Sequence, residues 1–216
     1  MRLVLVGPPG SGKGTQADRL ASEFGLKYIG TGVLLREAIA QGTDTGKVIE
    51  PLLKQGLFAP DPLVNGVVAD LFRDSGRPTC FVMDGYPRTL PQAIAFDALL
   101  REQRLTLDAV VNLVVPDEEV VRRISGRRCC SNAKCGVCFN VNFRPPDVAE
   151  KCDRCGSPLF LRDDDKEETL RRRLTEFHKT TDALLKHYRK QKLVRDVPAT
   201  DTPEVIFENI LTTLGR

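Results

Sequence analysis

The segment GPPGSGKGT, residues 7–15, has the residue types and spacing that bind the phosphate groups of a nucleotide. It fits the pattern GxxxxGK, in which glycines let successive backbone N–H groups turn toward phosphate oxygens and the lysine, here Lys13, contacts the β and γ phosphates. A helix that starts at this lysine would add its positive N-terminus to the same site. The phosphate contacts are therefore expected from Lys13 and from its neighbours Gly10, Ser11, Gly12, Gly14 and Thr15.

The sequence DGYPR, residues 84–88, supplies a carboxylate and a guanidinium directly after the apolar run 79–83. That run predicts a buried strand, in which Cys80 would be a structural thiol. Asp84 would then stand at the carboxyl end of the strand, where it can orient hydrated Mg²⁺, and the planar fork of Arg88 can hold a phosphate group at two points. An Asp-Gly turn without a ligand is the alternative, and the phosphate-binding loop upstream argues against it.

Six of the seven cysteines lie between residues 129 and 155, where the composition changes abruptly. In a reducing compartment such a cluster is typical of a metal site. The CxxC pair of Cys152 and Cys155 would supply two thiolates, and a second pair would complete a tetrahedral zinc site. Such a site can stabilise a unit that is too small to have a core of its own. A group of reduced structural thiols is the alternative interpretation.

The second pair of zinc ligands can be chosen in two ways. Cys135 and Cys138 have the commoner spacing, but the glycine that follows Cys135 repeats the glycine that follows Cys155, which favours Cys130 and Cys135. The favoured ligand set is Cys130, Cys135, Cys152 and Cys155, and Cys138 replaces Cys130 in the alternative set. In the favoured set Cys129 is expected to be a spare thiol.

Apolar periodicity predicts the elements that must position these groups. Continuous apolar runs typical of buried strands occur at residues 3–6, 26–29, 79–83, 109–115 and 193–197. Helical spacing follows the first run, ends near Gly25, and returns at residues 118–125, 170–188 and 207–214. Between residues 37 and 73 helical patterns alternate with glycines and prolines, which suits a small helical insertion.

The motifs, in their order along the chain, resemble those of the adenylate kinases among the nucleoside monophosphate kinases. The resemblance covers nearly the whole chain and rests on the segments 7–15, 31–36, 84–88, 126–128 and 162–173. It implies a doubly wound P-loop α/β fold with a five-stranded parallel sheet. It also implies a core of residues 1–29, 60–125 and 166–216, a nucleoside-monophosphate-binding helical insertion at 30–59, and a zinc-binding lid at 126–165.

The resemblance implies two nucleotide sites and a set of catalytic residues. In the family the first site binds ATP through the loop residues above together with Arg123, Arg127 and Phe139. The second binds AMP through Thr31, Gly32, Arg36, Leu57, Phe58, Ala59, Gly85, Tyr86, Pro87, Arg88, Gln92, Arg162 and Arg173. The residues that would act on the transferred phosphoryl group are Lys13, Asp84, Arg88, Arg127, Arg162 and Arg173. Sixteen residues separate Cys135 from Cys152, as in the family's zinc lids.

Gly14 separates Lys13 from the hydroxyl residue, Thr15, which in the general phosphate-loop pattern follows the lysine directly; the form GxPGSGKGT is the one that resembles the adenylate kinases. Three sites depart from the family pattern. Gly30 and Val33 replace a serine and an aspartate. Residues 197–200 lack the family's Asp-Gly turn, so no site residue is inferred there. A plain N-cap is an alternative role for Thr31, because it precedes a helical pattern.

The activity that the resemblance implies is transfer of the γ-phosphoryl group of ATP to AMP with Mg²⁺, which yields two ADP molecules, while zinc serves structure. Two alternatives remain open. One is another nucleoside monophosphate kinase, such as a GTP:AMP phosphotransferase, against which Thr31, Gln92 and the long lid argue. The other is a P-loop NTPase that binds nucleic acid through its cysteine module.

Composition sets limits on the partners of the chain. Its 216 residues are 41% hydrophobic, enough for one domain with insertions, and the formal net charge is only +3. No charge block indicates nucleic-acid binding, and no apolar run approaches the roughly 18 residues of a membrane span. The nucleotide loop follows the first strand directly, which leaves no room for a signal peptide. We expect a cytoplasmic monomer without nucleic-acid or membrane partners.

Overall fold

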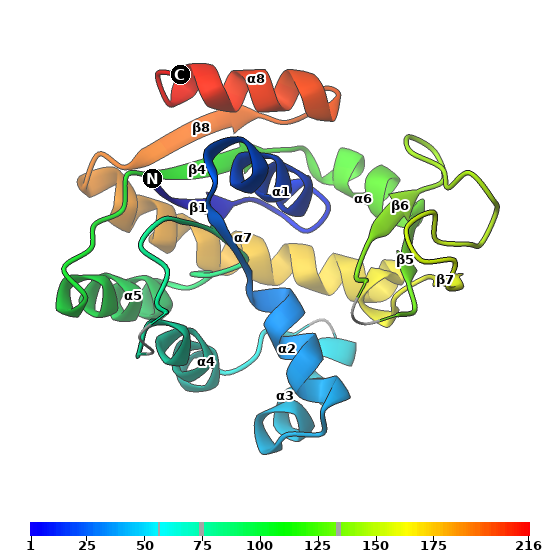
Figure 1. Cartoon of the computed structure of the whole chain (residues 1–216), viewed down its shortest axis with the longest axis horizontal. Helices are drawn as coiled ribbons and strands as arrows, with labels where there is room; N and C mark the ends of the chain where they lie inside the picture. Colours follow the sequence, from blue (N-terminus) through cyan, green and yellow to red (C-terminus); the bar gives the residue numbers. More distant parts are fainter. Residues whose placement is uncertain (56, 74–75, 133–134) are drawn as a thin grey trace.

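Five apolar segments form one parallel sheet among the residues that this computed structural model describes, which are 1–55, 57–73, 76–132 and 135–216. The strands are β1 (Arg2–Val6), β2 (Lys27–Gly30), β3 (Phe81–Asp84), β4 (Ala109–Val114) and β8 (Val194–Pro198). Their order is β2-β3-β1-β4-β8, and Figure 1 labels β1, β4 and β8 of this sheet. The order reverses at β1, and doubly wound sheets bind ligands at the carboxyl ends of strands beside such a reversal. The predicted fold class is confirmed.

Helices cover both faces of the sheet. Successive residues of a strand point to opposite faces, so each apolar strand contributes side chains to both buried clusters. Leu3 and Leu5 of β1 belong to one buried cluster, and Val4 and Val6 belong to the other. The first cluster includes residues of α1 (Lys13–Phe24), α6 (Asp117–Ser125) and α8 (Pro203–Thr213). The second includes residues of α4 (Asp61–Arg73) and α5 (Leu90–Glu102). The long helix α7 (Glu167–Lys190) contributes to both.

Two helices, α2 (Thr31–Ala40) and α3 (Asp44–Lys54), follow β2 and extend away from the sheet at the bottom of Figure 1. Thr43 caps α3, since its hydroxyl accepts a hydrogen bond from the Gly46 N–H at 3.0 Å. The two helices approach closely at Gly46, where a Cβ atom would lie 2.2 Å from the Ala38 carbonyl oxygen. Only a glycine therefore fits this crossing without a backbone shift.

The cysteine-rich segment forms a separate small sheet, visible at the right of Figure 1. Strand β5 (Arg127–Cys130) pairs antiparallel with β6 (Cys138–Asn140) and with β7 (Leu159–Phe160). The short 3-10 turn η1 (Asp163–Asp165) then leads into α7. Among its described residues, the buried cluster of this unit consists of Cys130, Phe139 and Cys152. So small an apolar cluster supplies little of the stability that a domain core would give.

Several expected boundaries match the structure, and one expectation about a thiol does not. Helix α1 ends before Gly25, which has the left-handed φ of +61° typical of a glycine after a helix. Strand β3 begins at Phe81 rather than at residue 79. Cys80 therefore lies just outside the strand and is exposed, so the prediction of a buried thiol was wrong. None of the helices in the described part of the chain has the length and apolar content to cross a bilayer.

Gly46→Ala is expected to destabilise the fold by about 1 to 3 kcal/mol, because the added methyl group must displace the α2 backbone. The matched control is Gly66→Ala in the middle of α4, where a Cβ atom would meet nothing within 4 Å. That control is expected to be neutral or to stabilise by about 0.5 to 1 kcal/mol, since alanine favours the helix. Urea unfolding of both variants measures the difference, and equal stabilities would contradict the crossing described above.

Candidate functional site

The loop between β1 and α1 presents backbone donors at the carboxyl edge of the sheet. Gly12 has a left-handed φ of +92° and directly precedes α1. Having no side chain, it leaves the first N–H groups of the helix available to an anion. At Gly10 the loop packs directly against α6, because a Cβ atom there would lie only 2.6 Å from the Ile124 side chain. The predicted phosphate-binding loop therefore has the backbone form that the motif requires.

Lys13 folds back over this loop. Its Nζ atom donates to the carbonyl oxygens of Gly7 and Pro8, each at 2.8 Å. Burial lowers the pKa of Lys13 to about 8; the charge of Asp84 opposes this shift, whereas Arg88, Arg173 and Arg127 add to it. One lysine and three arginines are thus close enough to repel one another.

The DGYPR segment turns back toward α2 and the sheet. Gly85 has a φ of +82°, and a Cβ atom there would lie 2.9 Å from the Thr31 hydroxyl. That hydroxyl donates to the Asp84 backbone oxygen at 3.2 Å, and α2 itself begins at Thr31 with Gly30 as its N-cap. The alternative of Thr31 as a simple N-cap was therefore wrong. The hydroxyl instead ties α2 to the end of β3.

Arg88 and Gln92 are held by contacts on the same side of the sheet. The Arg88 Nε donates to the Gly85 carbonyl oxygen at 2.8 Å, and its guanidinium lies over the Phe58 ring, 5.1 Å from the centroid. The Gln92 Oε1 accepts from the Arg88 backbone N–H at 2.7 Å, while its Nε2 donates to Asp61 at 2.7 Å. Arg88 is thus oriented by groups from three segments of the chain.

Asp165 is the buried carboxylate that joins the lid to the core. Its side chain has no exposed surface. Arg127 binds both of its oxygens, with Nε at 2.7 Å from Oδ2, and the Arg173 Nη1 lies 3.5 Å from Oδ1. A buried charge needs such partners, because removing it from water costs several kcal/mol. Asp165 therefore holds together two arginines that the sequence places 46 residues apart.

Several of these groups line one cavity of about 50 Å³. The predicted site residues that line it are Lys13, Phe58, Gly85, Pro87, Arg88 and Arg173. Others lie nearby without lining it: the Arg36 guanidinium packs over Gly32, where a Cβ atom would be 3.4 Å away, and Tyr86 is buried with its hydroxyl donating to Asn65 at 2.8 Å. Arg162 directly precedes η1.

Four predicted site residues point elsewhere in this structure. The Phe139 ring is buried with Cys130 and Cys152 in the lid. Arg123 forms an ion pair with Glu119 at 2.7 Å. Ala59 is part of the core, and Leu57 lines a separate opening together with residues of α7. The sequence placed these residues beside nucleotide bases, and the structure does not bring them to the cavity.

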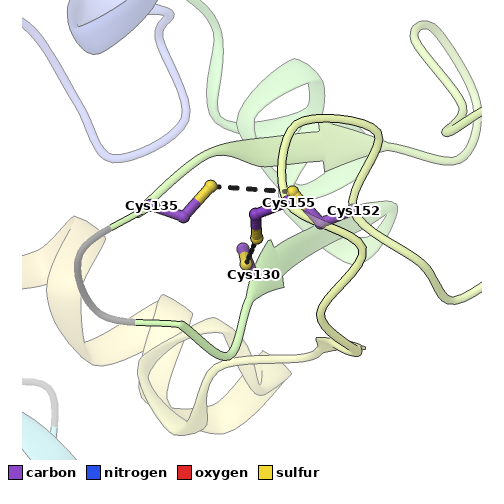
Figure 2. A group of neighbouring side chains, drawn as sticks. All are labelled: Cys130, Cys135, Cys152 and Cys155. Atoms are coloured by element: carbon purple, nitrogen blue, oxygen red, sulfur yellow. Dashed lines mark hydrogen bonds between the residues drawn. The ribbon is translucent and has the colours of Figure 1, made fainter.

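The lid brings four cysteine sulfurs together, those of Cys130, Cys135, Cys152 and Cys155 (Figure 2). All four lie within 4.8 Å of one another. The Cys130 and Cys155 sulfurs are 3.4 Å apart, and the Cys135 and Cys152 sulfurs are 3.7 Å apart. Zn–S bonds of about 2.3 Å in a tetrahedron place sulfurs about 3.8 Å apart, so the donor set and its spacing fit zinc.

The remaining lid cysteines pair with each other. Cys129 of β5 stands directly opposite Cys138 of β6, with their Cα atoms 4.0 Å apart, and the two form a disulfide. The expectation that Cys129 is a spare thiol was therefore wrong. It failed because spacing along the sequence does not reveal which residues face each other across an antiparallel pair, where Cα atoms approach to about 4.5 Å. Cys138 is thereby kept apart from the four-sulfur cluster.

The chain has two histidines, and each contacts a carboxylate that the sequence did not predict. His178 lies 2.9 Å from the Asp117 carboxylate and His187 lies 2.7 Å from that of Asp97. Each partner is on another helix, at least 61 residues away in the sequence. Both pairs lie outside the cavity and are structural contacts.

Together, the doubly wound sheet, the open N-terminus of α1 and the cations around one cavity are the features of a P-loop protein that binds nucleotide phosphates. Comparison with known proteins gives the family. A model of the adenylate kinase family matches residues 5–193. An adenylate kinase of Archaeoglobus fulgidus is 44% identical over 216 residues, which cover 100% of this chain and 99% of the relative. The adenylate kinases of Thermodesulfovibrio yellowstonii and Streptomyces avermitilis are each 42% identical to this chain over 216 residues. The match covers all of this chain in both cases, and 100% and 98% of the two relatives.

The chain belongs to the adenylate kinase family. Relatives of that name match it over its full length, so it is an enzyme with adenylate kinase function. The resemblance found in its motifs is confirmed.

Binding of ATP is expected to take up nearly one proton at pH 9 and almost none through Lys13 at pH 7. With a pKa of about 8, Lys13 is largely neutral in the free protein at pH 9, and a bound phosphate group raises its pKa and restores the charge. Affinity should therefore fall as pH rises through 8. Calorimetry in buffers of different ionisation enthalpy measures the uptake.

The matched control is Lys13→Arg, which keeps a positive charge that does not titrate in this range. Its proton uptake and affinity should be flat from pH 7 to 9. The same uptake in both proteins would show that Lys13 is not the titrating group.

Proposed function

We propose that the chain transfers the γ-phosphoryl group of ATP to an oxygen of the AMP phosphate, with Mg²⁺, and so forms two ADP molecules. The observation that carries this proposal is the convergence of Lys13, Arg88 and Arg173 on one cavity, with Arg127 joined to it through Asp165. The bond from the γ phosphorus to the leaving ADP oxygen breaks as the bond to the AMP oxygen forms. No nucleophilic side chain is needed, because the acceptor phosphate is itself the nucleophile.

The cations act through charge and alignment. Lys13 and the helix N-terminus neutralise the β and γ phosphates of the donor, and Arg88 holds the acceptor phosphate from the opposite side. Arg127, Arg162 and Arg173 balance the charge on the phosphoryl group in transit. Asp84 is the carboxylate that would hold the waters of Mg²⁺, and the bound ion would neutralise phosphate charge. Because these groups come from separate elements, the reactants are aligned only when the elements close around them.

We divide the chain by function into the core (1–29, 60–125 and 166–216), an AMP-binding insertion (30–59) and a lid (126–165). The extension of α2 and α3 from the sheet supports the first boundary. The separate lid sheet and the Arg127–Asp165 contact, which spans both ends of the lid, support the second. Lid closure would exclude water, which otherwise competes with AMP as acceptor.

The nucleotides are assigned to opposite sides of the cavity. The donor ATP binds along the loop of residues 10–15 and beneath the lid, where closure would carry Arg127 and Phe139 toward its phosphates and adenine. Arg123, in α6 of the core, would contact the same adenine. The acceptor AMP binds between α2 and the DGYPR segment. Its contacts would come from Thr31, Gly32, Arg36, Leu57, Phe58, Ala59, Gly85, Tyr86, Pro87, Gln92 and the three arginines Arg88, Arg162 and Arg173.

The lid cluster is proposed to hold a structural zinc ion through Cys130, Cys135, Cys152 and Cys155. Hydrogen bonds from Ser157 lower the pKa of Cys155 to about 6, so this ligand is readily available as a thiolate. Four protein ligands would leave no open position, which is typical of a structural rather than a catalytic site. Zinc would add to the little stability that the small apolar cluster of the described lid residues supplies.

Arg88→Ala is expected to lower the rate of ADP formation from ATP and AMP by at least about a hundredfold, because it removes charge that is needed in the transition state. The control is Arg73→Ala, which removes an exposed arginine paired with Asp70 on α4 and should leave the rate unchanged. A coupled assay with and without AMP measures both.

Two results would contradict the proposed reaction. One is ATP consumption by the wild-type protein that is independent of AMP and stimulated by a polynucleotide, as expected of a nucleic-acid-dependent NTPase. The other is a faster rate with GTP than with ATP as donor. Near wild-type activity of Arg88→Ala would refute the role given to that residue.

Zinc content per chain separates the two ligand sets. Cys130→Ser is expected to lose bound zinc, measured by plasma emission spectroscopy of the purified protein, because three thiolates bind it far less tightly than four. Cys138→Ser is the matched control and should retain one zinc ion, since this residue pairs with Cys129. Retention in the first variant together with loss in the second would overturn the assignment.

A further inference from the structure

Tyr28 of β2 makes a direct contact with the carboxylate of Asp84. Its hydroxyl donates a hydrogen bond to Asp84 Oδ2 at 3.2 Å. β2 and β3 are parallel neighbours in which Tyr28 pairs with Val82 and Gly30 pairs with Asp84. Tyr28 and Gly30, two residues apart, point to the same face of the sheet. The tyrosine side chain therefore runs along β2, over Gly30, to reach the residue opposite Gly30.

Gly30 makes this path possible. A Cβ atom on Gly30 would lie 2.5 Å from the Tyr28 hydroxyl oxygen and 2.8 Å from its Cζ, far inside van der Waals contact. The backbone at Gly30 has φ −98° and ψ 101°, an extended conformation open to any residue. The glycine is therefore needed for the space that it leaves rather than for its backbone conformation. Any side chain here would force the phenol away from Asp84.

The contact holds the carboxylate beside the phosphate-binding loop. Asp84 Oδ2, the atom that accepts from Tyr28, lies 3.5 Å from the position of a Cβ atom on Gly14. Burial, followed by the charges of Asp84 and Asp18, raises the pKa of the Tyr28 phenol, so it remains a donor at neutral pH. The main-chain oxygen of Asp84 is fixed by Thr31. Thr31 thus holds the backbone of Asp84, whereas Tyr28 holds its carboxylate.

We propose that Tyr28 is a positioning residue for phosphoryl transfer: its hydroxyl fixes the Asp84 carboxylate toward the phosphate loop, and Gly30 admits it. The inference rests on the proposed function in that Asp84 holds the waters of Mg²⁺. A freely rotating carboxylate would have to be ordered when the metal–nucleotide complex binds, and that ordering costs affinity. The hydrogen bond from Tyr28 orders the carboxylate before the metal–nucleotide complex binds. It touches neither the substrate nor the transferred group.

The first test compares Tyr28→Phe with the wild-type protein. The variant keeps the ring and loses only the hydroxyl, so its fold should persist. The affinity of Mn²⁺ for the protein–ATP complex, measured by electron paramagnetic resonance of free Mn²⁺, should weaken about three- to tenfold, the effect of one hydrogen bond. Binding of ATP without metal should not change. The Mg²⁺ concentration for half-maximal phosphotransfer should rise by the same factor.

Three further variants make the test specific. Tyr188→Phe, which alters a buried tyrosine of α7, should match the wild type. Gly30→Ala should weaken Mn²⁺ binding as Tyr28→Phe does, because its methyl group displaces the phenol. Asp84→Asn should weaken Mn²⁺ binding, and adding Tyr28→Phe to it should have no further effect.

Unchanged Mn²⁺ affinity in Tyr28→Phe or in Gly30→Ala would overturn the inference, and so would full additivity with Asp84→Asn. Absence of AMP-dependent phosphotransfer in the wild-type protein would refute the proposed function instead. The comparison of Mn²⁺ affinities does not depend on that reaction, so the two failures can be distinguished.

Discussion

The parallel pairing of β1 with β3 fixes where the charged groups of the site can be. Leu5 pairs with Asp84, and the phosphate-binding loop begins two residues later at Gly7. This register places a lysine-bearing loop and a carboxylate-bearing turn at one edge of the sheet, although they are separated by some 70 residues of chain. A slip of one residue would turn Asp84 to the other face of the sheet. The apolar clusters on both faces therefore secure the site as well as the fold.

A second constraint is the need to compensate buried charge. The Asp165 side chain is fully buried, and Arg127 and Arg173 contact it with opposite charge. These arginines come from the start of the lid and from α7, so the same contact that satisfies a carboxylate also fixes how the lid leaves the core. Zinc ligation would organise the interior of the lid, whereas Asp165 organises its attachment. Metal ligation would therefore stabilise the lid itself, and ion pairing attaches the lid to the core.

Local sequence patterns predicted much of the fold and the residues nearest the phosphates. The apolar runs gave the strands within a few residues, and the glycine-lysine motif gave the loop, because both depend on contacts close in the chain. The Cys129–Cys138 pair, the carboxylate partners of His178 and His187, and the contact of Tyr28 with Asp84 could not be predicted in this way. Each depends on strand register or helix packing between distant segments, which no local pattern records. For the contact of Tyr28 with Asp84, the one hint in the sequence was a tyrosine two residues before a glycine.

The crowding of positive charge around Lys13 has a consequence for the free protein. Burial lowers the pKa of this lysine most, and three arginines add to the shift although Asp84 opposes it, so each of these cations repels Lys13. Substitutions that remove a cation would ease that repulsion while removing the means to bind phosphate, so selection for stability and selection for catalysis act against each other at these positions. A nucleotide polyanion cancels the repulsion when it enters. Relief of that repulsion therefore adds to the attraction between the phosphates and the cations of the cavity.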